Sequence, residues 1–215
     1  MSWRSHRPTK QDHFRAQQRQ RRLTEAEQKQ SKANKEAQQS GANAEWLVEE
    51  QSALYLREQS AYVRKRYEPY RRVGRAGKGN MFKAVPTGAS GPDFEVWLRD
   101  GRAGLIEVKS RKGTRIELAA IGDTQALALR RMSEWGHLAL VLVRLNHEWF
   151  LVSYEAWTHH KKRSLNREDL SVQGVCCPVD TDNKPDFLSV LDDAIRVGAC
   201  YASSLPSRED RGSDT

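Results

Sequence analysis

Two runs near the middle of the chain, residues 93–98 and 103–109, are rich in aromatic and branched side chains. This composition, with apolar and polar positions alternating, is typical of β-strands. Asp100-Gly101 between the two runs is typical of a tight turn. The pattern therefore predicts a β-hairpin.

The length of the turn decides which residue faces Glu107 across this hairpin. A three-residue turn at residues 99–101, with Gly101 in the left-handed conformation, would place Asp93 opposite Glu107. A two-residue turn would place residue 94 there instead. Only the first alternative brings two carboxylates together.

Residues two apart in a strand share a face, so Glu107 and Lys109 lie on one side, and Ile106 and Val108 lie on the other. Two facing carboxylates repel unless a cation lies between them, and Mg2+ is a hard ion that prefers carboxylate and water oxygens. Lys109 beside them can orient or deprotonate a metal-bound water and offset the charge of a phosphate. The alternative is a surface hairpin with scattered charges.

The rest of the chain shows the periodicities of helices and further strands. Helices are predicted at residues 43–59 with Asn43 as N-cap, at residues 123–135 with Asp123 as N-cap, and at residues 185–195. Strands are predicted at residues 61–68, 137–145 and 149–153. This order of elements predicts an α/β domain.

The chain has 215 residues, a net charge of +8 and a sequence pI near 9.5. Such a charge favours a polyanionic partner, either nucleic acid or an anionic membrane surface. No run approaches the ~20 apolar residues of a membrane span, and the N-terminus lacks a signal-peptide pattern. The three cysteines are too few for a disulfide framework. We therefore expect a cytoplasmic protein that does not span a membrane.

The composition predicts three zones. Residues 1–40 hold ten Lys or Arg, eight Gln and four acids, so they form a basic arm that is disordered or a solvated helix. This arm either contacts nucleic acid or only aids solubility. Residues 41–202 are predicted to form the folded domain, and residues 203–215 have the composition of a tail.

A strongly basic segment, residues 57–83, precedes the hairpin, with nine Lys or Arg against two acids. Its aromatic residues could stack on exposed bases, although a sheet edge protected by basic residues would look similar. The stacking candidates are Tyr62, Tyr67, Tyr70 and Phe82. The candidate phosphate-binding residues, with two beyond the hairpin, are Arg64, Lys65, Arg66, Arg71, Arg72, Arg75, Lys78, Lys83, Arg111 and Lys112.

Pro92-Asp93, followed after thirteen residues by Glu107-Val108-Lys109, resembles the signature of the PD-(D/E)XK nuclease superfamily. The resemblance implies a restriction-endonuclease-like core, a mixed β-sheet flanked by helices. It also implies phosphodiester hydrolysis that depends on Mg2+, with Mn2+ as a substitute. In this reading Asp93, Glu107 and the backbone carbonyl of Val108 bind the metal.

The segments YVRKRYEPYRRV, residues 62–73, and MFKAVPTGASGPD, residues 81–93, resemble the RecU-type Holliday junction resolvases within that superfamily. In these enzymes a stalk precedes the catalytic hairpin, which places the stalk near residues 73–83 here. Ser90-Gly91-Pro92-Asp93 departs from the usual Thr-Thr-Asp triplet. The resemblance implies a homodimer that acts on four-way junctions, with recombination proteins as further partners.

Two more site residues follow from this resemblance alone. Gly41-Ala-Asn-Ala-Glu45 is similar to the entry of the first helix in such resolvases, where the Glu is an active-site acid and metal ligand. Glu49 is the second candidate for this role. Gln125 either faces the active site or is only a polar residue at a helix start.

The function expected is a structure-selective, Mg2+-dependent DNA endonuclease that resolves Holliday junctions by paired symmetric nicks. One alternative is a nuclease of the same class acting on another DNA structure, such as a flap or a replication end. The other is a non-catalytic junction-binding protein that modulates recombination.

Overall fold

The computed structural model describes residues 31–32, 36, 39–67, 70–75, 82–86 and 91–203. Internal contacts divide the chain into two units, Met1–Gln39 and Ser40–Thr215. In the first unit the described residues are helical. The second unit contains every strand of the described part of the chain, and the description below concerns it alone.

Six strands of the second unit form one mixed sheet in the order β1-β4-β5-β7-β8-β10. The strands are β1 (Ala61–Lys65), β4 (Phe94–Leu98), β5 (Ala103–Arg111), β7 (Leu138–Leu145), β8 (Glu148–Ser153) and β10 (Gly174–Cys177). The central strands β5 and β7 are parallel, and all other neighbours are antiparallel. Gly104 permits the close approach of β5 to β7, because a Cβ there would overlap the carbonyl oxygen of Leu138.

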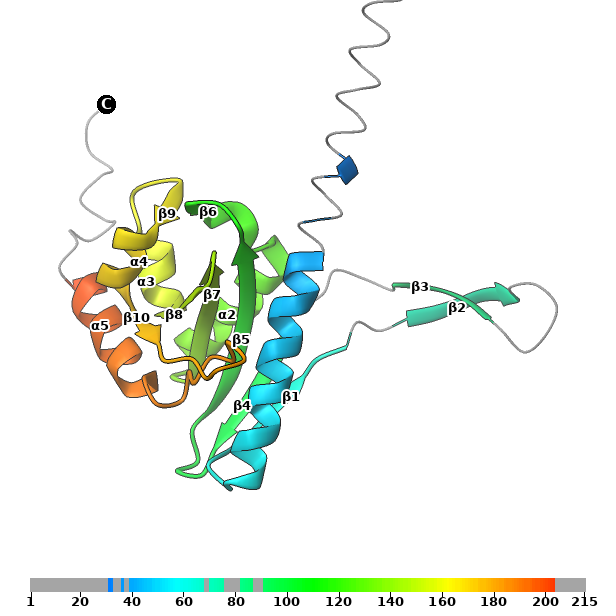
Figure 1. The fold of residues 1–215 in the computed structure, drawn as a ribbon, viewed down its shortest axis with the longest axis horizontal. Coiled ribbons are helices and arrows are strands. Elements are labelled where there is room, and N and C mark those ends of the chain that lie inside the picture. Colours follow the sequence, from blue (N-terminus) through cyan, green and yellow to red (C-terminus); the bar gives the residue numbers. More distant parts are fainter. Residues whose placement is uncertain are drawn as a thin grey trace, which may run out of the picture. The chain divides into compact units, whose positions relative to one another are not determined.

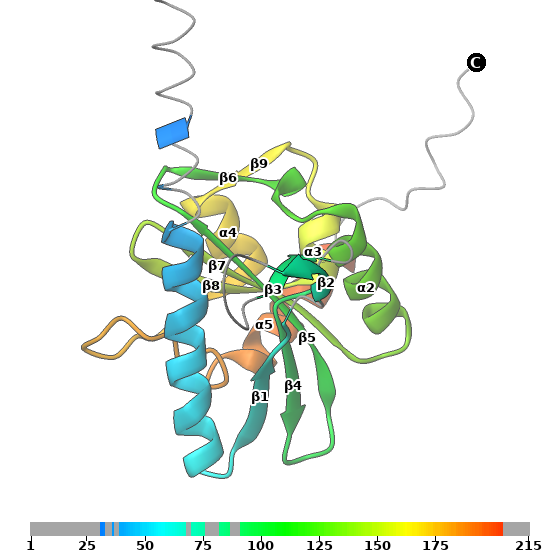
Figure 2. The same ribbon diagram turned by 90° about the vertical axis from the view of Figure 1, so that its right-hand side faces the viewer.

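Helices cover both faces of this sheet, as Figures 1 and 2 show for the first helix and α2 on opposite sides of β1, β4 and β5. The first helix, residues 40–57, and α5 (Leu191–Ser203) pack on one face, in a core that includes Val48, Ile106 and Ala194. The other face is covered by α2 (Asp123–Glu134), α3 (Tyr154–His159) and α4 (Arg167–Gln173). Because β7 is buried on both faces, its sequence is apolar at almost every position.

Two short sheets complete the described part. β2 (Tyr70–Arg75) and β3 (Phe82–Pro86) form a two-stranded antiparallel sheet with a register shift between Arg72 and Gly74. β6 (Arg115–Glu117) pairs with β9 (Ser164–Asn166), and the 3-10 turn η1 (Leu118–Ala120) follows β6. Within the described ranges, none of the helices has the length and apolar character to cross a bilayer.

The expected fold class, a mixed sheet flanked by helices, is confirmed, whereas several element boundaries were wrong. Asn43 lies inside the first helix, whose helical residues begin before it, and its Oδ1 accepts a hydrogen bond from Nη1 of Arg144. Asp123 is the first residue of α2, and Gly122 is its N-cap. The closing helix begins at Leu191, because Pro185 instead forms a β-bridge with Val179.

Candidate active site

The hairpin of β4 and β5 has the three-residue turn that the sequence allowed as one of two alternatives. Leu98 N donates to the carbonyl oxygen of Arg102 over 2.8 Å, and Gly101 has a φ of +91°. Phe94 pairs with Ile106, so Asp93 lies opposite Glu107. The register that brings the two carboxylates together is therefore confirmed.

Asp93 is held by backbone hydrogen bonds on both sides. Its Oδ2 accepts from the backbone N–H of Val108 over 2.8 Å, and its carbonyl oxygen accepts from the N–H of Arg66 over 2.7 Å. The second bond continues the pairing of β1 with β4. Neighbouring strands thus fix the position of this carboxylate, which lies just before β4 begins.

Glu107 lies in the centre of the sheet with a side chain that is fully buried. Nζ of Lys109 lies 2.5 Å from its Oε1. Neither carboxylate oxygen accepts a well-formed hydrogen bond from the described residues. A buried carboxylate with so few donors is costly when ionised, unless additional positive charge is bound.

The electrostatics of the pair follow from this burial. Burial raises the pKa of Glu107 to about 8, with a further contribution from the charge of Asp93, while Lys109 opposes the shift. Burial also raises the pKa of Asp93 to about 6, although the N–H of Val108 opposes it. Two facing acids with raised pKa values tend to share protons until a cation replaces those protons.

The donor set fits a divalent cation of the Mg2+ type. Asp93 and Glu107 supply carboxylate oxygens, neither oxygen of Glu107 accepts a well-formed hydrogen bond from the described residues, and a bound cation would counteract the rise of both pKa values. Among the described residues, no three His, Cys, Asp or Glu side chains are close enough to hold a metal. Water and backbone oxygens would therefore have to complete the coordination.

Glu45 lies near this pair but has a different partner. Its Oε2 is 3.2 Å from Nζ of Lys65, which also lies 3.3 Å from Oε2 of Glu49. The charge of Glu45 still contributes to the raised pKa of Asp93. The first helix therefore brings an acid to the site, as the resemblance implied, but Glu45 would have to leave Lys65 to bind a metal.

Gln125 lies beside Lys109, at the start of α2. Its Oε1 is 3.4 Å from Nζ of Lys109 and accepts the backbone N–H of Gly122 over 3.1 Å. In a capping box the side chains of the N-cap and N3 residues each accept a hydrogen bond from the other's backbone N–H. Here only the Gln125 side chain does so, because Gly122, the N-cap, has no side chain. Gln125 therefore both faces the site and caps the helix, so the two interpretations of this residue are compatible.

The basic residues predicted for DNA binding have diverse surroundings. Lys65 is paired with the two acids of the first helix and is largely covered. Arg64 and Arg66 share the carboxylate of Glu95, at 2.8 and 3.3 Å, and remain partly exposed.

The remaining candidates lie at exposed positions or outside the described part. Arg71 is exposed on β2, and Arg111 and Lys112 are exposed at the end of β5. Lys78 lies outside the described residues, as do the side chains of Arg72, Arg75 and Lys83 in β2 and β3. The same holds for the side chains of Tyr70 and Phe82, whereas Tyr62 and Tyr67 are exposed.

The burial of Glu107 predicts that Glu107→Gln stabilises the metal-free protein at alkaline pH. The folded protein keeps a proton that the unfolded chain loses, so wild-type stability falls as pH rises from about 4.5 to about 8. Urea unfolding in EDTA at pH 9 should show a gain on the order of 5 kcal/mol for the variant, since the pKa rises from 4.5 to about 8 on folding and one pKa unit corresponds to ~1.4 kcal/mol. At pH 5 the gain should be small.

Glu117→Gln is the matched control, because it removes an exposed carboxylate of β6.

Mg2+ should stabilise the wild type at pH 8 by ~2.7 kcal/mol at a hundredfold excess over the dissociation constant, and should leave the stability of Glu107→Gln unchanged. An equal stability difference between variant and wild type at both pH values would contradict the buried-charge explanation.

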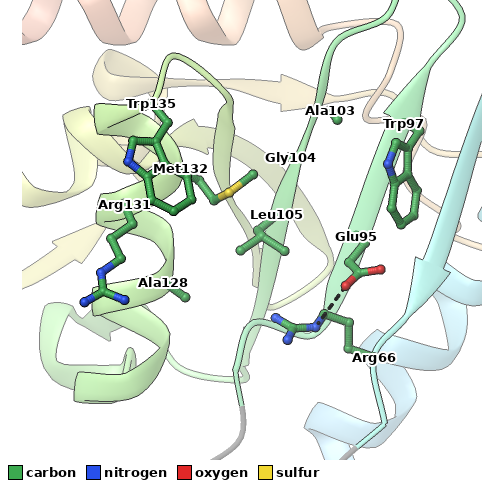
Figure 3. A pocket seen from close by; sticks show the side chains of 10 residues that line it. All are labelled: Arg66, Glu95, Trp97, Ala103, Gly104, Leu105, Ala128, Arg131, Met132 and Trp135. Carbon is green, nitrogen blue, oxygen red and sulfur yellow. Dashed lines mark ion pairs between the residues drawn. The ribbon is translucent and has the colours of Figure 1, made fainter.

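A groove beside the hairpin of β4 and β5 was not predicted from the sequence. It is lined by Trp97 of β4, Leu105 of β5 and Trp135 at the end of α2, and its volume is about 410 Å3 (Figure 3). The period of two already places Trp97 on the same face as Asp93. The position of Trp135 depends on how α2 packs, for which the sequence holds no local signal.

The described part of the chain is a mixed sheet flanked by helices, with Asp93 and Glu107-Val108-Lys109 facing each other across the hairpin of β4 and β5. A structurally similar protein is the Holliday junction resolvase Hjc of Archaeoglobus fulgidus, with 17% sequence identity and a TM-score of 0.37. The match covers 59% of this chain and 91% of that resolvase. No protein-family model and no curated protein matches the sequence. Any functional assignment therefore depends on the geometry of the site.

Proposed function

We propose that this protein is a divalent-metal-dependent DNA endonuclease that resolves Holliday junctions by paired symmetric nicks. The observation that carries the proposal is the carboxylate pair of half-buried Asp93 and fully buried Glu107, held opposite each other with Lys109 at 2.5 Å from Glu107. A buried carboxylate beside a second acid costs stability without a cation, so its presence favours a functional role over a structural one.

Asp93, Glu107 and the backbone carbonyl of Val108 would hold Mg2+ or Mn2+, with Glu45 as an additional acid. The bound ion would polarise the phosphate and lower the pKa of the attacking water. Lys109 would donate a hydrogen bond to that water or to a phosphate oxygen, and Gln125 would keep the ammonium group in position. The N–H of Val108, which donates to Oδ2 of Asp93, would hold this carboxylate in place for metal binding. The product would carry a 5′-phosphate.

Paired nicks on opposed strands require two catalytic sites related by the symmetry of the junction. We therefore propose that the protein acts as a homodimer. Its net charge of +8 would support binding to branched DNA through phosphate contacts. Recombination proteins are the further partners expected for such an enzyme.

Cleavage of a labelled four-way junction, beside linear duplex of the same sequence, tests this proposal in Mg2+ and in EDTA. We expect symmetric nicks in the junction strands with Mg2+, no nicks in EDTA, and little cleavage of the duplex. Cleavage of flaps or replication ends with intact junctions would instead support the other nuclease alternative. Junction binding without cleavage in Mg2+ or Mn2+ would support a non-catalytic protein.

The proposed stalk, residues 73–83, begins in β2 and ends in β3. Replacing Arg71, Arg72, Arg75 and Lys78 together by Gln should weaken junction binding and flatten its salt dependence, since each phosphate contact contributes ~0.9 to the log-log slope. The loss of affinity should be larger for junctions than for duplex, because only a junction has a central opening for the stalk to enter. Competition binding at two salt concentrations measures both effects.

Lys161→Gln combined with Arg163→Gln is the control, because these exposed basic residues follow α3 and precede β9. Equal losses on the two substrates, compared per charge removed, would exclude the stalk. They would leave the proposed nuclease activity untouched, since that rests on Asp93, Glu107 and Lys109.

A further inference from the structure

The groove beside the active site is open, aromatic and basic at its rim. Trp97 and Trp135 lie on opposite sides of it, and Leu105 and Met132 lie between them (Figure 3). Trp97 is 39% exposed and Trp135 is 68% exposed. Large exposed aromatic side chains that gather in one hollow mark a binding surface.

The groove adjoins the catalytic pair on the same face of the sheet. Leu105 is two residues from Glu107, and Trp97 is four residues from Asp93, which corresponds to ~7 and ~13 Å along a strand. A strand cut at the acids therefore passes the groove within a few nucleotides.

The charges around the groove match a polyanion. Arg66 and Arg131 line it, and its one acid, Glu95, is paired with both Arg64 and Arg66. The guanidinium of Arg64 also lies 5.7 Å from the ring centre of Trp97. The three arginines beside the indole rings thus outnumber the one acid by two.

We propose that this groove receives an unpaired nucleobase of the DNA strand being cut. The base stacks on Trp97 or Trp135, while Arg66 and Arg131 contact the adjoining phosphates. This inference rests on the proposed nuclease function and adds a substrate requirement to it. In intact duplex, a base pair must break before a base can fill the groove. Bases at a branch point are easier to unpair, so the groove selects branched DNA.

A second copy of this chain is the other occupant to consider. A stable dimer interface buries ~800 Å2 per partner and has an apolar centre with few charges. This groove is a hollow of about 410 Å3 with two arginines and a glutamate in its lining, which suits a base with its phosphate better than a flat protein surface.

The test combines removal of the tryptophans with removal of the base. Binding of the 215-residue chain to four-way junctions is measured in EDTA, and each junction carries one abasic nucleotide at a position that adjoins the branch point. For wild type, one abasic position should weaken binding about tenfold, the effect of losing one stacked base. The Trp97→Ala, Trp135→Ala double variant should bind the intact junction about tenfold more weakly and show no further loss at that position.

Trp46→Ala is the matched control, because Trp46 is 52% exposed on the first helix and lies outside the groove. It should respond to the abasic position as wild type does. If removal of the base weakens binding equally in the double variant and in wild type, the proposal is overturned. It is also overturned if the double variant changes its oligomeric mass and junction affinity does not depend on the base. Wild-type cleavage with Mg2+ is scored separately, so the groove can fail while the nuclease function holds.

Discussion

Asp93→Asn and Glu107→Gln will each abolish metal-dependent cleavage and leave junction binding at wild-type strength or stronger. Each change removes a negatively charged oxygen donor that a divalent ion needs, and the loss of metal stabilisation should reduce the rate by on the order of 10³-fold or more. Binding persists because both changes also remove repulsion between the site and the phosphates. Single-turnover cleavage and equilibrium binding of the same labelled junction measure the two effects.

Asp100→Asn is the control at the other end of the same hairpin, where the carboxylate is exposed in the turn and pairs with Arg102. It removes the same chemical group and should cleave like wild type. Loss of binding in parallel with cleavage, in a variant that unfolds at the wild-type urea concentration or above it, would refute the separation of metal coordination from DNA affinity.

The sequence narrowed the register of the β4–β5 hairpin to two alternatives, one of which the structure shows, because both determinants are local. Gly101 allows the positive φ of a three-residue turn, and the period of two then brings Asp93 opposite Glu107. Ile106 and Val108 enter the core on the reverse face, as the alternation indicated. Such features need no knowledge of distant residues.

Features that depend on packing between distant elements were not predicted. Lys65 was assigned to DNA from its basic neighbourhood, yet it lies between Glu45 and Glu49, sixteen residues or more before it. Asn43 has the residue type of an N-cap, but its side chain contacts Arg144 of β7 inside a helix that began earlier. In both cases a tertiary contact overrides the local preference.

Lys109→Met should reduce cleavage by about 10²- to 10⁴-fold while metal binding persists. The ammonium group lies 2.5 Å from Oε1 of Glu107, and in the proposed mechanism it acts on the attacking water. Its loss leaves both carboxylates available to the ion, although Glu107 will then hold its proton more tightly. More Mg2+ should therefore be needed at neutral pH than at pH 9, and raising its concentration should not restore the rate.

Gln125→Ala is the informative comparison, because Gln125 contacts Lys109 and caps α2 without a charge of its own. It should lower the rate about fivefold, as expected for a positioning residue whose single hydrogen bond is worth ~1 kcal/mol. Mg2+-dependent stabilisation against urea at pH 9 separates the roles. If Lys109→Met loses this stabilisation together with cleavage, Lys109 acts through metal binding alone and not on the water.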